Sequence, residues 1–178
     1  MPADTGSASR RLKIQIEVRD ADLLTFDGDA IIVPTISDGF MVEGIAARVK
    51  AAAGRSVEDE ALGSAPIAVG AAVVTSAGAL PSRRAVHVPV SEQAALKVGV
   101  ENIRRATRAG LLAATHFQLE QVAIPGFGYG EMGVPYDEAA RAIIDEIRAY
   151  RGTHPRVVVL LDTDPEMVNA FQTELDDC

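Results

Sequence analysis

Four glycines close together in the last third of the chain could bind an anion: Gly126, Gly128, Gly130 and Gly133. They lie between the apolar run 121–124 and an expected helix that Pro135 opens. Glycine adopts positive φ easily, so the N–H groups of such a turn can point toward one place and form a concavity for a phosphate. The dipole of the following helix adds partial positive charge there. The segment therefore predicts a phosphate-binding loop.

Two other interpretations of this segment exist. The spacing from Gly128 to Gly133 formally fits the dinucleotide fingerprint G-x-G-x-x-G, but that fingerprint belongs to the first strand-to-helix turn of a Rossmann domain. The position late in the chain leads us to reject it. The loop could also merely turn the chain, and Glu131, Asp137 and Glu138 favour this because carboxylates repel phosphate. Phosphate binding therefore requires those three carboxylates to point outward.

The remaining reactive side chains form no recognisable catalytic or metal-binding set. His87 stands in the middle of an expected strand, which favours a structural role, and His116 and His154 have no ligand spacing between them. Cys178 is the only cysteine and closes an acidic tail, so one chain can build neither a disulfide nor a thiolate metal site. We therefore expect no metal and no other cofactor.

Length and composition limit the possible classes of protein. The chain has 178 residues, of which 48% are hydrophobic, so it fits one domain with one sizeable core. It has no apolar run near the roughly 20 residues that span a bilayer and no start typical of a secretion signal, so we expect a soluble, cytoplasmic protein. The net charge of −8 argues against nucleic acid as a partner. We expect a disordered leader at 1–12 and a single domain at 13–178.

Apolar patterns predict six strands. Alternation with period two over 13–18 is typical of an edge strand, and the continuous apolar run 30–33, which Pro34 stops, is typical of a central strand covered on both faces. The other expected strands are 69–75, 85–88, 121–124 and 156–161.

Helical spacing predicts five helices between these strands. The first covers 43–53 and is ended by Gly54, Ser56 caps a short second, and the expected ranges of the other three are 100–114, 135–150 and 164–175. Alternating strands and helices favour an α/β fold in three layers, α/β/α, with a mainly parallel mixed sheet in the centre.

Several segments occur in the order of the macro domain family and resemble its motifs. QVAIPGFGYGEMGVPYDEAAR at 121–141 is similar to that family's second phosphate loop and the helix after it. PIAVGAAVVTSAG at 66–78, GIAARVKAAAG at 44–54, and ADLL at 21–24 with DAII at 29–32 are similar to three more of its motifs. The resemblance covers roughly residues 14–175. It implies a macro domain whose cleft holds ADP-ribose or a related nucleotide.

The resemblance also implies which residues contact the ligand. Asp22 would accept the adenine amino group, although it could instead be a turn or cap residue. Amides of the second loop would bind the phosphates, and the Tyr129 ring, in place of the usual threonine, could pack over the ribose or lean outward. The full expected set is Asp22, Gly44, Ile45, Gly126, Phe127, Gly128, Tyr129, Gly130 and Glu131.

The sequence departs from the family where catalysis would be affected. The family's N-A-A-N motif, whose second asparagine holds the distal ribose, falls on Val33-Pro34-Thr35-Ile36. The first phosphate loop keeps only Gly44 after Met41-Val42-Glu43, whose side chains would crowd a pyrophosphate. An adenine-packing aromatic of the last helix is also missing, with Met167 or Val168 in its place. These departures indicate an altered site, for which a changed ligand is one interpretation.

Three hypotheses follow. The first is a module that binds ADP-ribose or a related nucleotide, free or on an ADP-ribosylated protein, with a homodimer as the default assembly. The second is an ADP-ribosyl or ADP-ribose phosphate hydrolase, in which water is positioned by Asp38 or Glu43 and the substrate's own phosphate; Asp38, Glu43 and Glu131 could converge at a cleft. The third is a macro domain without a nucleotide site, in which Met41, Val42 and Tyr129 fill the cleft. The absent asparagine favours the first.

Overall fold

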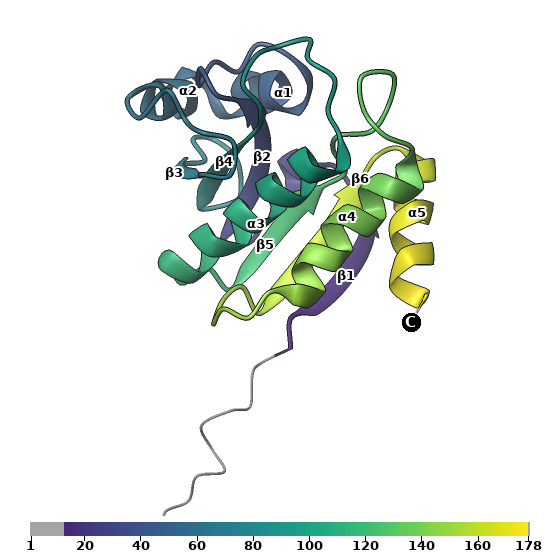
Figure 1. Ribbon diagram of the computed structural model, residues 1–178. Coiled ribbons are helices and arrows are strands. Elements are labelled where there is room, and N and C mark those ends of the chain that lie inside the picture. The colour runs from purple at the N-terminus through teal and green to yellow at the C-terminus, as the bar shows by residue number, and fades with distance from the viewer. Residues whose placement is uncertain (1–12, 178) are drawn as a thin grey trace, which may run out of the picture.

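Six strands form one mixed sheet in the computed structural model, which describes residues 13–177 (Figure 1). The strand order is β1-β6-β5-β2-β4-β3, and every neighbouring pair is parallel except β3 with β4. The expected leader at 1–12 and Cys178 lie outside the described residues. The strands are β1 (Gln15–Asp20), β2 (Ala30–Ile36), β3 (Val73–Ser76), β4 (Arg84–Ser91), β5 (Gln121–Pro125) and β6 (Val157–Asp162).

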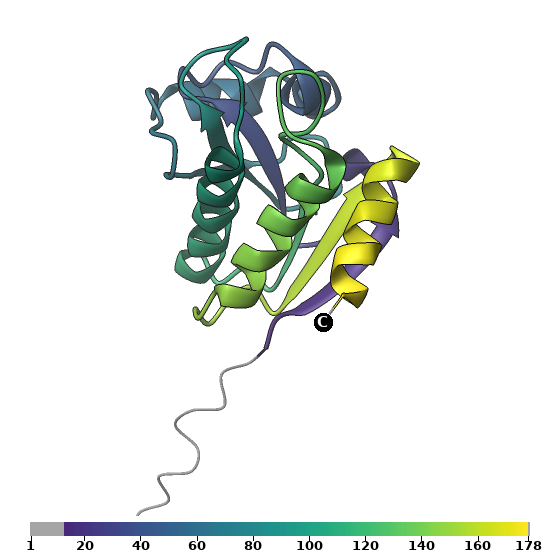
Figure 2. The ribbon, with the colours of Figure 1, turned by 45° about the vertical axis from the view of Figure 1, so that its right-hand side comes forward.

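Helices cover both faces of the sheet, so the three-layer α/β/α fold with a mainly parallel sheet is confirmed. Figure 2 shows α3, α4 and α5 side by side over one face, and α1, α2 and the short 3₁₀ helix η2 pack on the other. The helices are η2 (Leu23–Thr25), α1 (Gly44–Ala53), α2 (Arg55–Leu62), α3 (Val100–His116), α4 (Tyr136–Ala149) and α5 (Pro165–Asp176). Within residues 13–177, none of these helices is long and apolar enough to cross a membrane.

Central strands contribute alternate residues to two separate cores. In β2, Ile32 packs into the core under α3 and α4, whereas Ile31 and Val33 pack into the core under α1 and α2. The same alternation holds in β6, where Leu160 and Leu161 belong to different cores. Burial on both faces explains why these strands are continuously apolar in sequence.

The structure corrects the expected end of β2. Pro34 does not stop the strand, which continues to Ile36 and pairs with β4 throughout. Beyond Ile31, β2 has no pairing with β5. One edge of the strand is therefore open at position 34, and a proline is tolerated at such an edge because no ladder bond is lost there.

Two further boundaries differ from expectation. Ser56 does not cap α2, because Gly54 (φ +105°) ends α1 and is at the same time the N-cap of α2. β3 begins only at Val73, since Gly70 has a φ of +97° and turns the chain just before it. Both differences come from glycines that adopt backbone conformations disfavoured for other residues.

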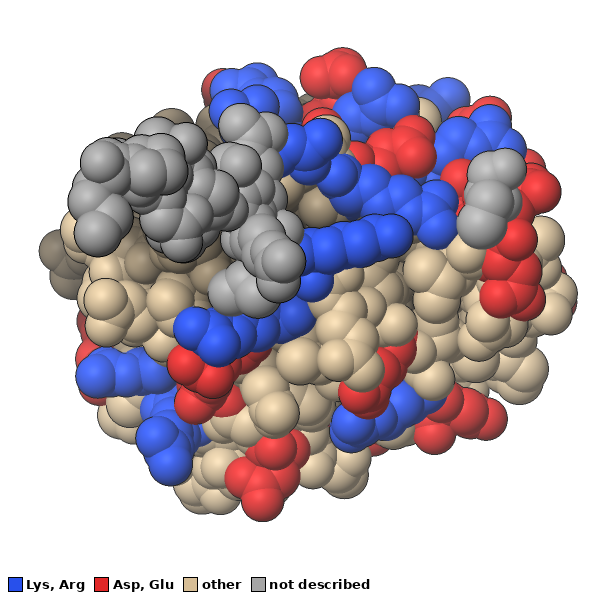
Figure 3. All heavy atoms as spheres, turned by 90° about the horizontal axis from the view of Figure 1, so that it is seen from below, with Lys and Arg blue, Asp and Glu red and all other residues tan. Residues whose placement is uncertain are grey.

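The parallel strands all begin at one end of the molecule and end at the other. Lys13, Arg84 and Arg156 stand at or beside the first residues of β1, β4 and β6. Figure 3, which looks onto this end, shows a band of Lys and Arg side chains across it. The carboxyl ends of the strands meet at the opposite end, where α4 and α5 begin (Figure 1).

Candidate functional site

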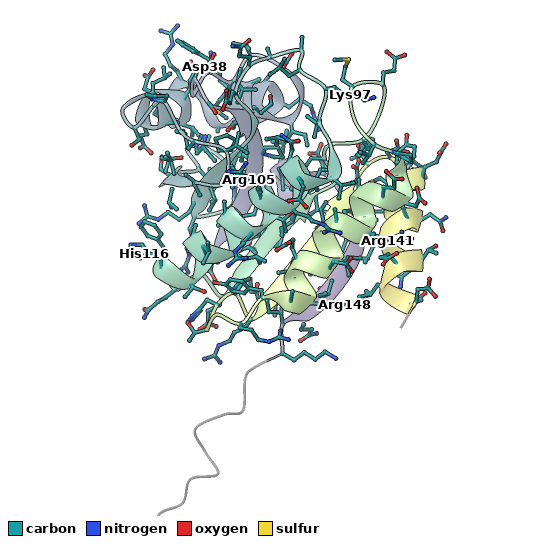
Figure 4. All side chains as sticks on the ribbon, in the orientation of Figure 1. Asp38, Lys97, Arg105, His116, Arg141 and Arg148 are labelled. Carbon is teal, nitrogen blue, oxygen red and sulfur yellow. The ribbon has the colours of Figure 1, made fainter. Side chains whose placement is uncertain are left out.

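Two adjoining hollows lie at the carboxyl edge of the sheet, where ligands of α/β proteins usually bind. The larger has a volume of about 450 Å³ and the smaller about 260 Å³. We call them the large and the small compartment. Ile45 and Tyr129 line both, so the two form one continuous cleft. Figure 4 shows Asp38 and Lys97 at this end of the molecule and Arg148 toward the other end.

The lining of the large compartment is mostly apolar. It comprises Pro34, Thr35, Ile36, Phe40, Val42, Glu43, Gly44, Ile45, Ala46, Val90, Ser91, Ala95, Leu96, Val98, Phe127, Gly128, Tyr129, Met132 and Gly133. The small compartment is more polar and is lined by Ala21, Asp22, Leu23, Ile45, Arg48, Pro125, Gly126, Tyr129, Leu161, Asp162, Thr163 and Asp164.

The four glycines of the 126–133 loop serve two different purposes. Gly128 and Gly130 have φ values of +78° and +109°, in the region that favours glycine. Gly126 and Gly133 do not have positive φ, which corrects the expectation for all four. They are required by close approach: a Cβ at Gly126 would lie 2.5 Å from Met167 Cγ, and one at Gly133 would lie 2.0 Å from the Gly128 carbonyl oxygen.

Hydrogen bonds within the loop leave some amides available and occupy others. The Gly130 N–H donates to the Val134 carbonyl at 3.3 Å, and the Val134 N–H donates to the Gly128 carbonyl at 2.9 Å. Gly130 is therefore not available as an anion donor, contrary to expectation. The N–H groups of Gly128 and Tyr129 make no hydrogen bond within residues 13–177. These two amides stand where the compartments meet.

The acidic residues near the loop satisfy the condition for phosphate binding. Glu131, Asp137 and Glu138 are all exposed, and none of them lines either compartment. Asp137 and Glu138 stand in the first turn of α4, where a carboxylate is stabilised by the helix dipole. The side chains of Asp137 and Glu138 thus have a structural explanation, and they lie outside the cleft.

Asp22 lines the small compartment and also has structural partners. Its Oδ1 accepts a hydrogen bond from the Leu24 N–H at 3.0 Å, so it caps η2, as the alternative interpretation expected. Its Oδ2 pairs with the Arg48 guanidinium of α1. The sequence had not indicated Arg48, which is the only lysine or arginine in the lining of either compartment within the described chain.

The Tyr129 ring forms the wall between the two compartments. Its hydroxyl donates to Asp162 Oδ2 at 2.8 Å, and its ring centroid lies 4.8 Å from that of Tyr136. Burial, together with the Asp162 carboxylate, raises the Tyr129 pKa well above its usual value. The ring therefore does not lean outward. The Tyr136 hydroxyl makes a parallel bond to Asp164 at 2.7 Å, which raises the Tyr136 pKa to about 12.

The aromatic side chain of the small compartment is Tyr129 and not a residue of the last helix. Met167 is fully buried in the core beneath Gly126, and neither it nor Val168 lines a compartment. The expectation that one of them replaces the adenine-packing aromatic is therefore wrong. Asp162, the last residue of β6, and Asp164, two residues later, were missed; their position at the carboxyl end of a parallel strand was the available signal.

The first loop does not fill the cleft. Met41 is buried in the core under α1 and α2, so its expected crowding of the ligand is wrong. The Met41 N–H donates to Glu58 Oε2 at 2.8 Å, and Glu58 also pairs with Lys50 Nζ at 2.9 Å. Val42 and Glu43 do line the large compartment, with ample space left beside them.

The expected acidic residues do not converge. Asp38 Oδ1 accepts a hydrogen bond from the Phe40 N–H at 2.9 Å and lines neither compartment, and Glu131 also lies outside both. Among the described residues that line the large compartment, Glu43 is the only one with a carboxylate. The structure therefore contradicts the choice of Asp38 as a candidate for positioning water.

His87 is an internal residue of the sheet. It is fully buried, its Nε2 lies 2.9 Å from Thr75 Oγ1, and it lines neither compartment. Burial lowers the His87 pKa to about 4. This placement agrees with a structural role. Among the described residues, no three His, Cys, Asp or Glu side chains lie close enough together to hold a metal ion.

Most of the expected ligand residues gather at the cleft. Seven of them line it: Asp22, Gly44, Ile45, Gly126, Phe127, Gly128 and Tyr129. Gly130 and Glu131 do not. The end of β4 and the loop after it also line the cleft, through Val90, Ser91, Ala95, Leu96 and Val98, and residues 90–98 had no periodic or motif signal in the sequence.

Comparisons with known proteins agree with this architecture. The family model described as Macro domain matches residues 34–143. A protein from Aquifex aeolicus is 40% identical over 162 residues, which are 91% of this chain and 98% of that protein. A macrodomain mutant from Oceanobacillus iheyensis, solved with ADPR, has a TM-score of 0.80 at 18% identity, covering 95% of this chain and 96% of that one. A Trypanosoma brucei macrodomain in complex with ADP-ribose has a TM-score of 0.78 at 18% identity, covering 90% and 69%.

The matched segment, from Pro34 in β2 to Ile143 in α4, contains all the residues that line the large compartment. The strand order, the position of the cleft and the sequence matches all lead to the same assignment. This chain belongs to the macro domain family.

Proposed function

We propose that this protein binds a nucleoside diphosphate of the ADP-ribose type, with the nucleoside in the small compartment and the phosphates at the Gly128–Tyr129 turn. The observation that carries the proposal is the pair of amides at Gly128 and Tyr129, which have no internal partner and stand at the junction of the compartments. The ADP-ribose-bound macrodomains of similar fold support the choice of ligand class.

The first turn of α1 provides a second group of donors. Glu43 is the N-cap of α1 and its side chain makes no capping bond, while Gly44 and Ile45 line the large compartment. The amides at the start of a helix lack intrahelical acceptors and carry partial positive charge. A diphosphate between this turn and the Gly128–Tyr129 turn would receive N–H groups from both sides.

Amides suit this cleft because cations are scarce in it. Arg48 is the only cationic side chain among the described lining residues, and it is already paired with Asp22. The band of Lys and Arg side chains lies at the other end of the molecule (Figure 3). Phosphate affinity would therefore depend on oriented dipoles and much less on charge.

Binding without turnover is favoured over hydrolysis. Ile36 stands where the hydrolases of the family have their asparagine, and it lines the large compartment as an apolar residue. Asp38 is excluded from the cleft, so Glu43 alone could position water. An ADP-ribosyl hydrolase is the second candidate, and release of free ADP-ribose from a modified protein would support it.

Calorimetry with ADP-ribose and ADP tests the proposal, and we expect one-site binding of both. A Gly128→Ala variant should weaken binding about tenfold or more, because its Cβ would lie 2.5 Å from Ile103 and displace the turn. Gly130→Ala is the matched control, since it has the same kind of strained φ but nothing within 4 Å of the new Cβ. No heat with wild-type protein up to millimolar ligand would overturn the proposal.

A further inference from the structure

Exposed apolar side chains concentrate around the large compartment. Residues 13–177 contain six large hydrophobic side chains that are exposed: Phe40, Val42, Leu96, Leu112, Phe117 and Met132. Four of these line the large compartment, and each is between 47% and 62% exposed: Phe40, Val42, Leu96 and Met132. They come from three loops that are far apart in sequence. Single exposed apolar residues are ordinary, but a group gathered around one hollow indicates a binding surface.

Polar side chains available to a ligand are correspondingly few in this compartment. Its lining contains four side chains with polar oxygens: Thr35, Glu43, Ser91 and Tyr129. The Ser91 hydroxyl donates to the Gln93 carbonyl at 2.7 Å, and the Tyr129 hydroxyl donates to Asp162. The Thr35 hydroxyl is buried with no partner, so a ligand cannot reach it. Glu43 remains as the only accessible, unengaged polar side chain in the described lining.

This inventory does not suit a sugar. The amides at the start of α1 are assigned to the diphosphate, so a ribose here would find one free carboxylate, that of Glu43, among the described side chains for its several hydroxyl groups. A buried polar group without a hydrogen-bond partner weakens binding. The same carboxylate disfavours a further phosphate by like charge.

We propose that the large compartment holds an apolar group, alkyl or aromatic, that is joined to the diphosphate of the nucleotide in the place of a sugar. This inference rests on the proposed function, which assigns the nucleoside and the phosphates to the rest of the cleft. The volume of about 450 Å³ lies in the range of small-molecule sites. Ile45 and Tyr129 line both compartments, so one molecule can extend from one into the other.

Titration calorimetry with four ligands tests the inference: ADP, ADP-ribose, and the n-butyl and phenyl β-esters of ADP. Each buried methylene contributes about 0.8 kcal/mol, or about fourfold in affinity. We therefore expect both esters to bind at least about tenfold more tightly than ADP, and ADP-ribose to bind no more tightly than ADP. If ADP binds but the esters gain nothing, or if ADP-ribose binds most tightly, this inference is wrong and the proposed function stands. If none of the four binds, both are wrong.

Two variants test whether the apolar group of the ester binds in the large compartment. Leu96→Ser and Met132→Ser should each reduce the ratio of the affinity for the butyl ester to the affinity for ADP by about threefold or more. Leu112→Ser is the matched control, because Leu112 is exposed to a similar degree, 49%, but lines neither compartment. An ester advantage that survives both variants, or that the control removes equally, would place the apolar group elsewhere and overturn the inference.

Discussion

At the scale of single residues, His87 couples the stability of the fold to pH. Its ring is fully buried in the sheet, and burial lowers its pKa to about 4. In the unfolded chain a histidine has a pKa of about 6.5. Between these two values the unfolded chain takes up a proton that the folded chain does not, so acid favours unfolding in this range.

We expect His87 to account for a loss of up to about 3 kcal/mol in unfolding free energy between pH 6.5 and pH 4. A His87→Gln variant, whose amide can reach the Thr75 hydroxyl, should lack this component. Urea denaturation of both proteins at pH 7.5 and pH 4.5 measures it. Carboxylates titrate in both proteins and cancel in the comparison, so a difference between wild type and variant that does not change with pH would contradict the prediction.

Individual site residues could be predicted where they belong to a recognisable family motif, and could not be predicted outside such motifs. Asp22 and Gly128 were found because neighbouring residues resemble a family motif. The bond between Tyr129 and Asp162 joins two segments that only the fold brings together, and no local pattern indicates it. Met167 was placed wrongly because the family resemblance gives a position in the last helix but does not say what that position packs against in this chain.

At the scale of elements, Glu58 of α2 holds the first loop in place. Its carboxylate is buried, accepts the Met41 N–H and pairs with Lys50 of α1. One side chain therefore connects two helices to the segment that presents Val42 and Phe40 to the large compartment. A buried carboxylate with both a backbone donor and a cation has its charge well compensated.

Glu58→Gln should lower the free energy of unfolding by about 1–3 kcal/mol, because Lys50 loses its partner. It should also weaken ADP-ribose binding, since the loop becomes less restrained. Glu60→Gln is a control on the same helix: Glu60 is exposed and bonds to Ser76 of β3, away from the cleft. Urea denaturation and calorimetry measure both effects. Equal losses of affinity in the two variants would argue against a specific role for Glu58.

Strands and helices were largely predictable because both faces of the sheet are buried. Burial makes the strands continuously apolar and gives the helices one apolar face, and both patterns are visible in sequence. Strand order and the path of the loops were not predictable, because non-periodic segments such as 92–98 carry no pattern. Pro34 shows the limit within a strand: the sequence does not reveal that one edge is open at that point.

At the scale of the whole molecule, the distribution of charge disfavours the approach of a negatively charged ligand to the cleft. The protein has a net charge of −8, its cleft contains one paired arginine, and the Lys and Arg band lies at the far end (Figure 3). Under the proposed function, a diphosphate would therefore be repelled at long range and bound at short range by amides. Salt screens the first effect, with a Debye length of about 10 Å at 0.1 M, and hardly changes the second.

The affinity for ADP should consequently stay constant or rise by up to about twofold between 50 and 500 mM NaCl. Calorimetry at constant pH across this range measures it. A site built from lysine and arginine would lose affinity steadily over the same range, so a decrease of about fivefold or more would show that cations dominate binding.

Ile45 and Tyr129 belong to the walls of both compartments, and this shared partition makes the two occupants interdependent. Any group in one compartment that moves the Tyr129 ring changes the volume of the other compartment. Thermodynamic linkage requires such an influence to be equal in both directions. A group in one compartment that displaces the Tyr129 ring would therefore change the affinity of the other compartment by the same factor as a group in the other compartment changes its own.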